Sequence, residues 1–178
     1  MLQDALRYAV ELNWWVFPCH TPIIDRPGFF CSCEVFRRKK QPDYKCYNPG
    51  KHPRTANGLD DATIDPDQIR EWWGQWPNAN IGINCGKSGL LVIDLDTYKD
   101  TYSGHNMNLD EETVTAITGG GGTHLFYRLN PSDTFGNGKK DLPVGIDIRA
   151  HGGYVIVAPS LHISGRRYQW ELGYEPWN

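Results

Sequence analysis

The pattern of hydrophobic and polar positions predicts two helices. Near the start of the chain, apolar residues recur every three or four positions: Leu2, Ala5, Leu6, Ala9 and Val10. This spacing places an apolar stripe along one face of a helix. A second helix is expected to begin at Asp65, which has the residue type of an N-cap and is followed by Pro66 and a capping-box partner, Gln68. Its apolar positions are Ile69, Trp72, Trp73 and Trp76, and Pro77 is expected to end it.

Short apolar runs bounded by turn residues predict strands. These runs are residues 14–18, 81–84, 90–96, 124–129, 146–149 and 154–158. A glycine-containing turn, 86–89, joins the runs 81–84 and 90–96, so we expect these two strands to form a hairpin. A polar stretch follows from 97 to 107, and a short helix is expected near 110–117.

Length and charge narrow the class of protein. A chain of 178 residues fits one domain with one active site. No apolar run approaches the roughly 20 residues that span a bilayer, and the first residues lack the basic head of a signal peptide. We therefore expect a cytoplasmic protein with no membrane partner. The net charge of −3 provides no global basic field, so any nucleic-acid contact must come from local patches such as 37–40, which reads RRKK.

The segment from Thr21 to Asn57 is rich in proline, cysteine and basic residues and has no clear period. That length is unusual for a structureless loop in a compact domain, so something other than a hydrophobic core should order it. Four of the five cysteines lie between Cys19 and Cys46. In a cytosolic chain such a cluster indicates metal binding before it indicates disulfides.

Three of these cysteines and a histidine have the spacing of a zinc site. The pattern C-x-C-x12-C-x5-H is formed by Cys31, Cys33, Cys46 and His52. These ligand types can close a tetrahedral site, and structural zinc would order the long segment. Cys19 or His20 is an alternative for one ligand, and free buried thiols are the alternative to zinc.

The basic run 37–40 has Phe36 before it and Tyr44 and Tyr47 after it. Basic side chains with interleaved aromatic rings can contact phosphates and stack on bases. The alternative is an ordinary solvated surface, which is what most charge runs are.

The run 90–96 closes with two carboxylates, Asp94 and Asp96. At a spacing of two they project from the same face of a strand, and they repel each other unless a cation lies between them. Hard oxygen ligands of this kind suit Mg²⁺ or Mn²⁺. The alternative for an isolated D-x-D pair is a solvated strand end.

A third carboxylate, Asp147, lies between two isoleucines, so strand alternation turns it and Arg149 to the opposite face. If that face meets Asp94 and Asp96, three carboxylates can hold two metals about 4 Å apart, the arrangement used for nucleotidyl transfer. Arg149 would then neutralise phosphate oxygens. A simple surface ion pair is the alternative.

Four glycines, 119–122, precede Thr123 and His124. Without side chains, their backbone amides can approach an anionic ligand closely, and the imidazole would stand at the start of the next strand. This arrangement suits a phosphate cradle. The alternatives are an ordinary turn and a structural histidine.

Taken together, these segments resemble one family. Motifs I, II and III of the primase-polymerase (Prim-Pol) family, within the archaeo-eukaryotic primase superfamily, are matched by VIDLD, by TGGGGTH followed by LFYR, and by GIDIRAHGGYVIVAPS. The flanking segments GKHPRTANGLDDAT, IREWW and PNANIGINCG are similar to that family as well. The resemblance therefore covers nearly the whole chain.

This resemblance implies a mixed α/β (α+β) fold. The archaeo-eukaryotic primase-like core would contain an RRM-like antiparallel sheet, with an N-terminal α/β module and a zinc-binding insertion at 19–57. Residues 1–178 would form one catalytic domain. The implied activity is that of a template-dependent DNA polymerase or primase, a nucleotidyltransferase in which two divalent metals serve the joining of nucleotides with release of pyrophosphate.

The resemblance also implies roles for particular residues. The two Mg²⁺ or Mn²⁺ ions would be bound by Asp94, Asp96 and Asp147. The incoming nucleotide would be contacted by His124, which belongs to the catalytic set, together with Arg149, Gly121, Gly122, Thr123 and Lys51. The sequence departs from the common family pattern at Gly120, where a serine often stands.

The implied partners are a DNA template and primer and a dNTP or NTP, with a helicase or a helical priming domain elsewhere in a full-length protein. A phage or other mobile element is the expected source. Two other functions stay open: a catalytically inactive, zinc-stabilised module that binds nucleic acid or nucleotide, and a metal-dependent nuclease. Nucleotide-dependent strand extension distinguishes the first function from both alternatives.

Overall fold

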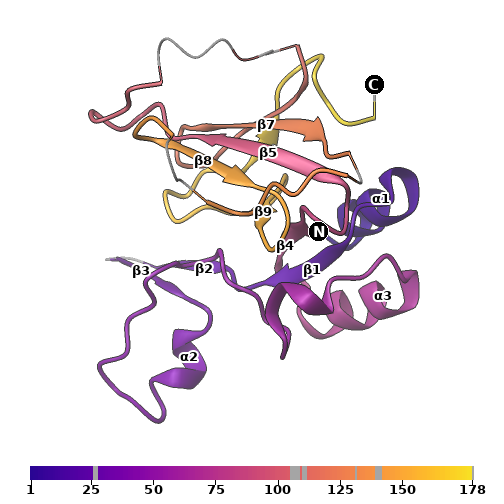
Figure 1. The fold of residues 1–178 in the computed structure, drawn as a ribbon. Coiled ribbons are helices and arrows are strands. Elements are labelled where there is room, and N and C mark those ends of the chain that lie inside the picture. Colours follow the sequence, from indigo (N-terminus) through magenta and orange to yellow (C-terminus); the bar gives the residue numbers. More distant parts are fainter. Residues whose placement is uncertain (26–27, 105–108, 110–111, 131, 139–141, 178) are drawn as a thin grey trace.

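The computed structural model describes residues 1–25, 28–104, 109, 112–130, 132–138 and 142–177. It has the expected mixed α/β architecture, with few helices and only antiparallel strand pairs in its sheets (Figure 1). Within the described residues, none of the helices has the length and apolar character needed to cross a membrane.

A five-stranded antiparallel sheet forms the larger layer. Its strands, in spatial order, are β10 (Gln169–Trp170), β6 (Val114–Ile117), β7 (Thr123–Arg128), β5 (Leu90–Leu95) and β8 (Ile146–Arg149). The central strand β5 therefore has β7 on one side and β8 on the other, although these neighbours come from distant parts of the sequence.

A three-stranded antiparallel sheet forms the second layer. It consists of β1 (Val16–Cys19), β4 (Asn80–Asn84) and β9 (Tyr154–Ile156), in that order. The hairpin expected from 81–84 and 90–96 is wrong, because β4 and β5 lie in different sheets. The reason is that β1 and β9 already occupy both edges of β4, so the turn at 86–89 carries the chain to the other sheet instead.

The connection between β8 and β9 crosses between the sheets in the same way. The two crossings lie together: the amide of Cys85 donates to the carbonyl of Gly153 at 3.0 Å. Gly86 lies directly against this second crossing, since a Cβ on it would stand 3.0 Å from the Cα of His151. Cys85 is fully buried, as expected for a core residue.

Both predicted helices are present, as α1 (Leu2–Leu12) and α3 (Pro66–Gln75). The Asp65 side chain caps α3 by accepting from the amide of Asp67 at 3.0 Å. Gln68 does not complete the capping box, because its amide donates to Glu71 within the helix.

The helix expected near 110–117 is wrong over 114–117, which form β6; residues 110 and 111 lie outside the described residues. The segment reads VTAI, and its β-branched residues suit a pleated surface. It is paired on both sides, with β7 and β10, so tertiary pairing decides its conformation.

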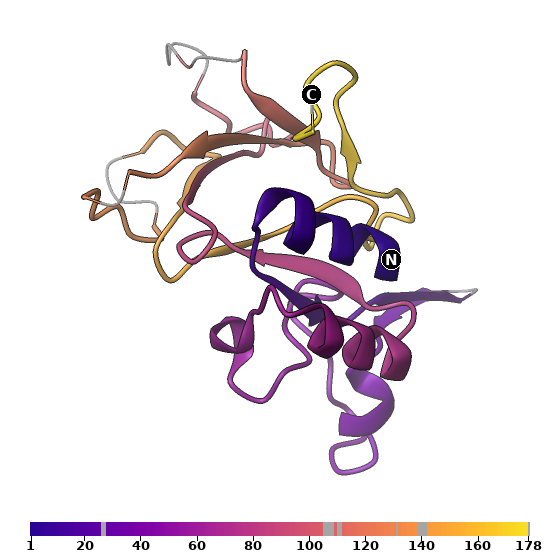
Figure 2. The same cartoon turned by 90° about the vertical axis from the view of Figure 1, so that its right-hand side faces the viewer.

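Helix α1 packs one face between elements of both sheets (Figure 2). Tyr8 is buried; its hydroxyl donates to the carbonyl of Ala158 at 2.6 Å and accepts from Trp170 Nε1 at 2.9 Å. The ring of Trp14 stacks on Phe126 of β7, with centroids 5.6 Å apart. These contacts fix the two sheets relative to each other.

The segment that lacked a period has secondary structure of its own, which the sequence pattern did not predict. It contains the hairpin strands β2 (Pro22–Asp25) and β3 (Gly28–Cys31) and the short helix α2 (Glu34–Arg37), and a 3₁₀ turn, η1 (Gly58–Asp61), follows it. Figure 1 shows β2, β3 and α2 extending away from the five-stranded sheet. We refer to residues 19–57 as the cysteine module.

Candidate active site and metal cluster

Strand register brings the predicted catalytic residues together on the five-stranded sheet. Asp94 of β5 stands directly opposite His124 of β7 on one side and opposite Asp147 of β8 on the other. Directly paired residues of antiparallel strands project from the same face, with Cα atoms about 4.5–5.5 Å apart. Three side chains from separate segments therefore share one surface.

The same sheet face is apolar at its other end. Val92 and Phe126 are paired across β5 and β7, are buried, and pack in the core cluster that contains α1. Two residues away from this pair, Asp94 on β5 and His124 on β7 take the place of apolar side chains. Thus the part of the face under α1 stabilises the fold, and the part beyond it presents polar groups.

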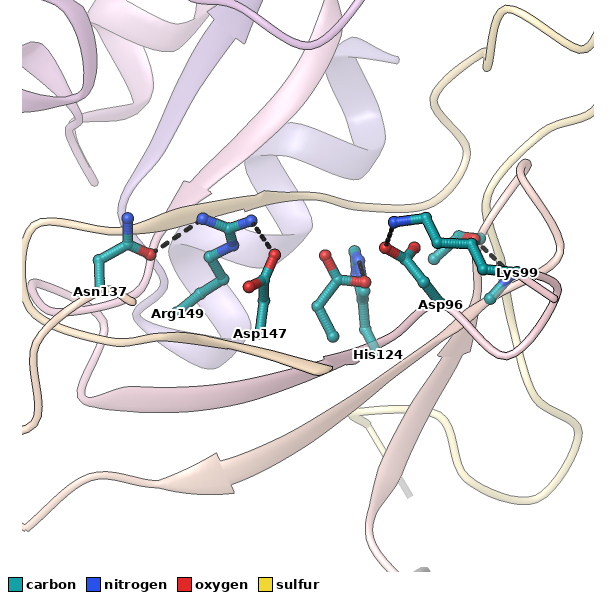
Figure 3. A network of polar contacts seen from close by, with 9 residues as sticks. Asp96, Lys99, His124, Asn137, Asp147 and Arg149 are labelled. Atoms are coloured by element: carbon teal, nitrogen blue, oxygen red, sulfur yellow. Dashed lines mark hydrogen bonds and ion pairs between the residues drawn. The ribbon is translucent and has the colours of Figure 1, made fainter. Parts of the chain in front are cut away.

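These polar groups contact one another in a row (Figure 3). The His124 Nε2 and Asp94 Oδ1 atoms are 3.4 Å apart. Arg149 donates from one guanidinium nitrogen to Asp147 Oδ2 at 2.9 Å and from another to Asn137 Oδ1 at 3.2 Å. The Asp147–Arg149 pair is not a solvated surface pair, since Asp147 is only 5% exposed.

Asp96 lies just beyond the end of β5, where its amide donates to the carbonyl of Gly145 at 2.8 Å. Its carboxylate forms an ion pair with Lys99, and this hydrogen bond raises the pKa of Lys99 above its ordinary value. In Figure 3 Asp96 lies in the same row as Asp147 and His124, at the end where Lys99 approaches.

Burial and charge act in opposite directions on Asp94. Burial by itself raises the pKa of this carboxyl, but the hydrogen bond and charge of His124, aided by Arg149 and Lys51, lower it below the usual range. Asp94 is therefore an anion at neutral pH. The His124 ring is 5% exposed, and among the described residues nothing forms a hydrogen bond with its buried Nδ1 atom.

A cavity of about 270 Å³ opens beside these side chains. It lies between the two sheets, because its lining includes Asp94 and His124 of the larger sheet and Tyr154 of β9. Cationic groups reach it from two directions: Arg149 from β8 and Lys51 from the cysteine module. Such a cavity, lined by the carboxylate of Asp94 and by two cationic side chains, suits a phosphate-bearing ligand together with a metal.

The carboxylate set fits divalent magnesium or manganese. Asp94 and Asp147 offer hard oxygen ligands from directly paired positions, and both are largely removed from water. Two buried anions at this spacing repel each other unless cations compensate them. Arg149 supplies part of that charge, and the composition of the donor set favours Mg²⁺ or Mn²⁺ over softer metals.

The four glycines form the turn between β6 and β7. The amide of Gly121 donates to the Thr118 carbonyl at 3.0 Å, and the amide of Gly122 donates to Thr118 Oγ1 at 2.9 Å. A Cβ on Gly122 would stand 2.4 Å from the carbonyl oxygen of Leu95, so close packing by itself requires a glycine there. The amides of Gly121 and Gly122 are thus used inside the turn, and the phosphate cradle expected from the four glycines stays a prediction. Thr123 is the first residue of β7 and does not line the cavity.

The cysteine module brings four metal-ligand side chains together. The ligand atoms of Cys31, Cys33, Cys46 and His52 all lie within 4.8 Å of one another. His52 Nε2 is 3.4 Å from Cys31 Sγ and 3.3 Å from Cys46 Sγ. Tetrahedral zinc requires ligand atoms roughly 3.5–3.8 Å apart. The cluster could hold zinc.

The thiol chemistry also favours a bound cation. Burial raises the pKa of Cys31, but hydrogen bonds, that from His52 first, lower it to about 7. Burial and the neighbouring thiols raise the pKa of Cys33 well above its ordinary value. Three adjacent thiolates therefore form readily only when a metal neutralises them.

The two alternative ligands lie outside this cluster. Cys19 is buried in β1, where burial raises the pKa of its thiol well above normal. The His20 ring packs beside His52, with centroids 4.5 Å apart, but its Nδ1 atom is hydrogen-bonded to Ser32 Oγ at 2.9 Å. Glu34, the first residue of α2, is also buried. Its carboxylate accepts from the amide of Cys31 and pairs with Arg38, so it fixes the chain around Cys31 to α2.

Several residues at the catalytic face were not predicted from the sequence. Asn137 orients Arg149, Lys99 pairs with Asp96, and Tyr168 packs near the His124 ring, with centroids 6.1 Å apart. Asn48 also lines the cavity. Only Lys99 carried a usable signal, its position three residues after Asp96; the others reach the site through the tertiary fold.

A family model described as bifunctional DNA primase/polymerase, N-terminal (Prim-Pol) matches residues 5–177. The chain belongs to the Prim-Pol family. This confirms the resemblance inferred from the three motifs and supports a DNA primase/polymerase type of function. Prim-Pol enzymes use divalent metals and act on DNA and nucleotides. No curated protein was found that matches the chain.

Proposed function

We propose that this Prim-Pol domain is a template-dependent nucleotidyltransferase with one active site on the five-stranded sheet. The observation that carries the proposal is the register of three strands, which sets Asp94 opposite both His124 and Asp147 at the edge of a cavity that Lys51 and Arg149 also line. Acidic and basic side chains thus lie within a few ångströms of one another. Transfer of a nucleotide from a triphosphate requires both kinds of group at one site.

In this proposal, Asp94, Asp96 and Asp147 hold two magnesium or manganese ions. When bound, such ions activate the primer hydroxyl and stabilise the pyrophosphate that leaves. Asp94 suits this role because its carboxyl is anionic at neutral pH despite burial. Asp96 would give up part of its pairing with Lys99 to bind the metal.

The remaining residues bind and orient the triphosphate. Arg149 is oriented by Asp147 and Asn137, so its guanidinium is positioned before any nucleotide arrives. Lys51, from the cysteine module, adds a second cation to the cavity lining. His124 is oriented through Nε2 by Asp94 and by the nearby Tyr168 ring, and it would contact the phosphates. We assign no phosphate contact to the amides of Gly121 and Gly122. Thr123, the next residue, begins the strand that carries His124.

The test is incorporation of labelled nucleotides on a primed DNA template with Mg²⁺ or Mn²⁺. Wild type should extend the primer, whereas Asp94→Ala and Asp147→Ala should not. Asp67→Ala provides a matched control, because this carboxylate is 92% exposed on α3 and pairs only with Arg70 among the described residues. It should extend primers as wild type does.

The alternatives give different results in the same assay. A metal-dependent nuclease would shorten the labelled strand without added nucleotide. An inactive binding module would bind nucleotide or DNA, as measured by calorimetry, but the folded, zinc-loaded chain would not extend the primer. Either result would contradict the proposal.

A further inference from the structure

Charge is distributed unevenly between the cysteine module and the rest of the chain. Residues 19–57 contain 8 of the 18 Lys and Arg residues and 3 of the 21 Asp and Glu residues, a net charge of +5. The rest of the chain therefore carries −8, which gives the total of −3. A domain that acts on DNA but is acidic overall needs a local basic surface, and this module is where the basic residues concentrate.

The basic side chains of the module are presented to solvent. Arg37, Lys39, Lys40 and Lys45 are all exposed. Arg38 is different, because it pairs with the buried Glu34 and donates to the carbonyl of Tyr44 at 3.0 Å, so it stabilises the module. Among the described residues, no carboxylate forms an ion pair with the other four. Their charges are available to an anionic partner.

Aromatic rings accompany these charges. Tyr47 is 94% exposed, so its ring is accessible to a partner. The Arg37 guanidinium lies over the Tyr44 ring, 5.1 Å from its centroid. Phe36, the aromatic residue expected to accompany the basic run, has a side chain that lies outside the described residues. Basic groups interleaved with exposed rings are typical of surfaces that bind single-stranded nucleic acid.

The surface leads directly into the catalytic cavity. Tyr47 is followed by Asn48, which lines the cavity, and Lys51 lines it as well. Lys51 lies four positions after Tyr47 in the sequence, so the chain between them spans at most about 14 Å. The position of this segment is fixed from the core, because Tyr154 donates to the Lys51 carbonyl at 2.9 Å and Asn80 donates to the Gly50 carbonyl at 2.9 Å.

We propose that the outer surface of the cysteine module binds the single-stranded part of the DNA template. Arg37, Lys39, Lys40 and Lys45 contact its phosphates, and Tyr47 stacks on a base close to the active site. The identification of the bound DNA as the template rests on the proposed function, but the binding itself does not depend on catalysis. The metal cluster then serves to order a DNA-binding surface next to the catalytic cavity.

The test measures binding of a fluorescein-labelled single-stranded oligonucleotide by anisotropy at several salt concentrations. Lys39→Ala/Lys40→Ala should weaken binding about tenfold and reduce the salt slope by about 1.4, since each phosphate contact on single strands contributes about 0.7. The matched control, Arg70→Ala/Arg128→Ala, removes two exposed basic side chains outside the module. Its affinity and slope should equal those of wild type.

Tyr47 is tested separately. Tyr47→Ala should weaken binding about tenfold, and Tyr47→Phe, which keeps the ring, should restore it. Zinc content and thermal melting are measured for each variant, so that loss of the module is distinguished from loss of a contact. Equal effects of the two double variants, or wild-type binding by Tyr47→Ala, would overturn the proposal.

Primer extension is measured on the same wild-type preparation. If DNA binding depends on the module but no nucleotide is incorporated, the proposed catalytic function is wrong and the proposed DNA-binding surface is supported. If extension proceeds and the module variants bind DNA normally, the surface fails and the catalytic function stands.

Discussion

The five-stranded sheet and the cysteine module both gather metal-ligand side chains, but they do so by different physical means. On the sheet, register places Asp94 between His124 and Asp147, and the strands themselves are stabilised by burial of residues such as Val92 and Phe126. In the module, few large apolar side chains are buried, and the cluster is formed by Cys31 at the end of β3, Cys33 just before α2, and Cys46 and His52 beyond it.

This difference indicates which site depends on its metal for structure. The proposed catalytic carboxylates project from a sheet that a hydrophobic core already stabilises, so their geometry should persist without magnesium or manganese. The cysteine module resembles small domains in which the free energy of metal binding supplies the free energy of folding. Four predictions test this contrast, in order of decreasing expected effect.

Removing zinc should unfold the module and leave the core folded. Structural zinc contributes about 10 kcal/mol or more to small sites, far more than any single contact in the module. With a chelator, or in Cys33→Ser, trypsin should cut after the basic residues 37–45 on the order of 100-fold faster, while the cooperative melting of the core remains. Mass spectrometry of the fragments locates the cuts.

The matched control is Cys85→Ala, which removes a buried thiol that lies outside the cluster. It should retain one zinc per chain and wild-type resistance in the module. A core that melts together with the module on chelation would contradict the separation of the two regions.

Replacing His124 should abolish catalysis without affecting the module. His124→Ala removes the imidazole that faces Asp94 and the cavity, and we expect primer extension to fall by about 10²–10³-fold. His162→Ala is the control, because His162 packs at the glycine turn and does not line the cavity. An equal loss in both variants would indicate a structural role for His124.

Lys51 should connect the two regions, because it directly precedes His52 of the cysteine cluster and lines the cavity beside Asp94. Lys51→Ala should weaken nucleotide binding by about tenfold, the usual effect of losing one charge-assisted contact. Calorimetry with a dNTP measures this directly.

Zinc removal should weaken nucleotide binding in the wild type, because it disorders the contact between Lys51 and the nucleotide. It should cause little further loss in Lys51→Ala, which already lacks that contact. Lys40→Ala is the control and should bind the nucleotide normally. Additive effects of the variant and the chelator would show that the cluster does not act through Lys51.

The smallest effect concerns the helix cap at Asp65. Asp65→Ala removes the acceptor for the Asp67 amide and should reduce the free energy of unfolding of the core by about 1 kcal/mol. Urea denaturation measures the change. The reduction should be the same with and without zinc if the core is independent of the module, whereas a zinc-dependent value would contradict that independence.

Local patterns were sufficient for most elements and for the chemistry of both sites. The amphipathic spacing of α1 and the cap and tryptophans of α3 identified these helices, because helix formation depends largely on residues within a few positions of one another. The motif around Asp94 and Asp96 and the spacing of the four candidate zinc ligands pointed to metals, since side-chain chemistry is a property of the residues themselves.

Strand partners required the tertiary structure. Nothing near β4 in the sequence shows that β1 and β9 occupy its edges, so an expected hairpin with β5 was wrong. Residues 114–117 were expected to continue a helix but form β6, because pairing with β7 and β10 outweighs weak local preference.

The assembly of each site was likewise decided by the fold. Asp94, His124 and Asp147 are separated by 30 and 23 residues in the chain, and antiparallel register makes them neighbours. The roles of Asn137 and Tyr168, and the approach of Lys51 from the cysteine module, have no local signal at all. Sequence determines which groups are present, but distances between remote groups depend on how sheets pair and pack, which is a property of the whole chain.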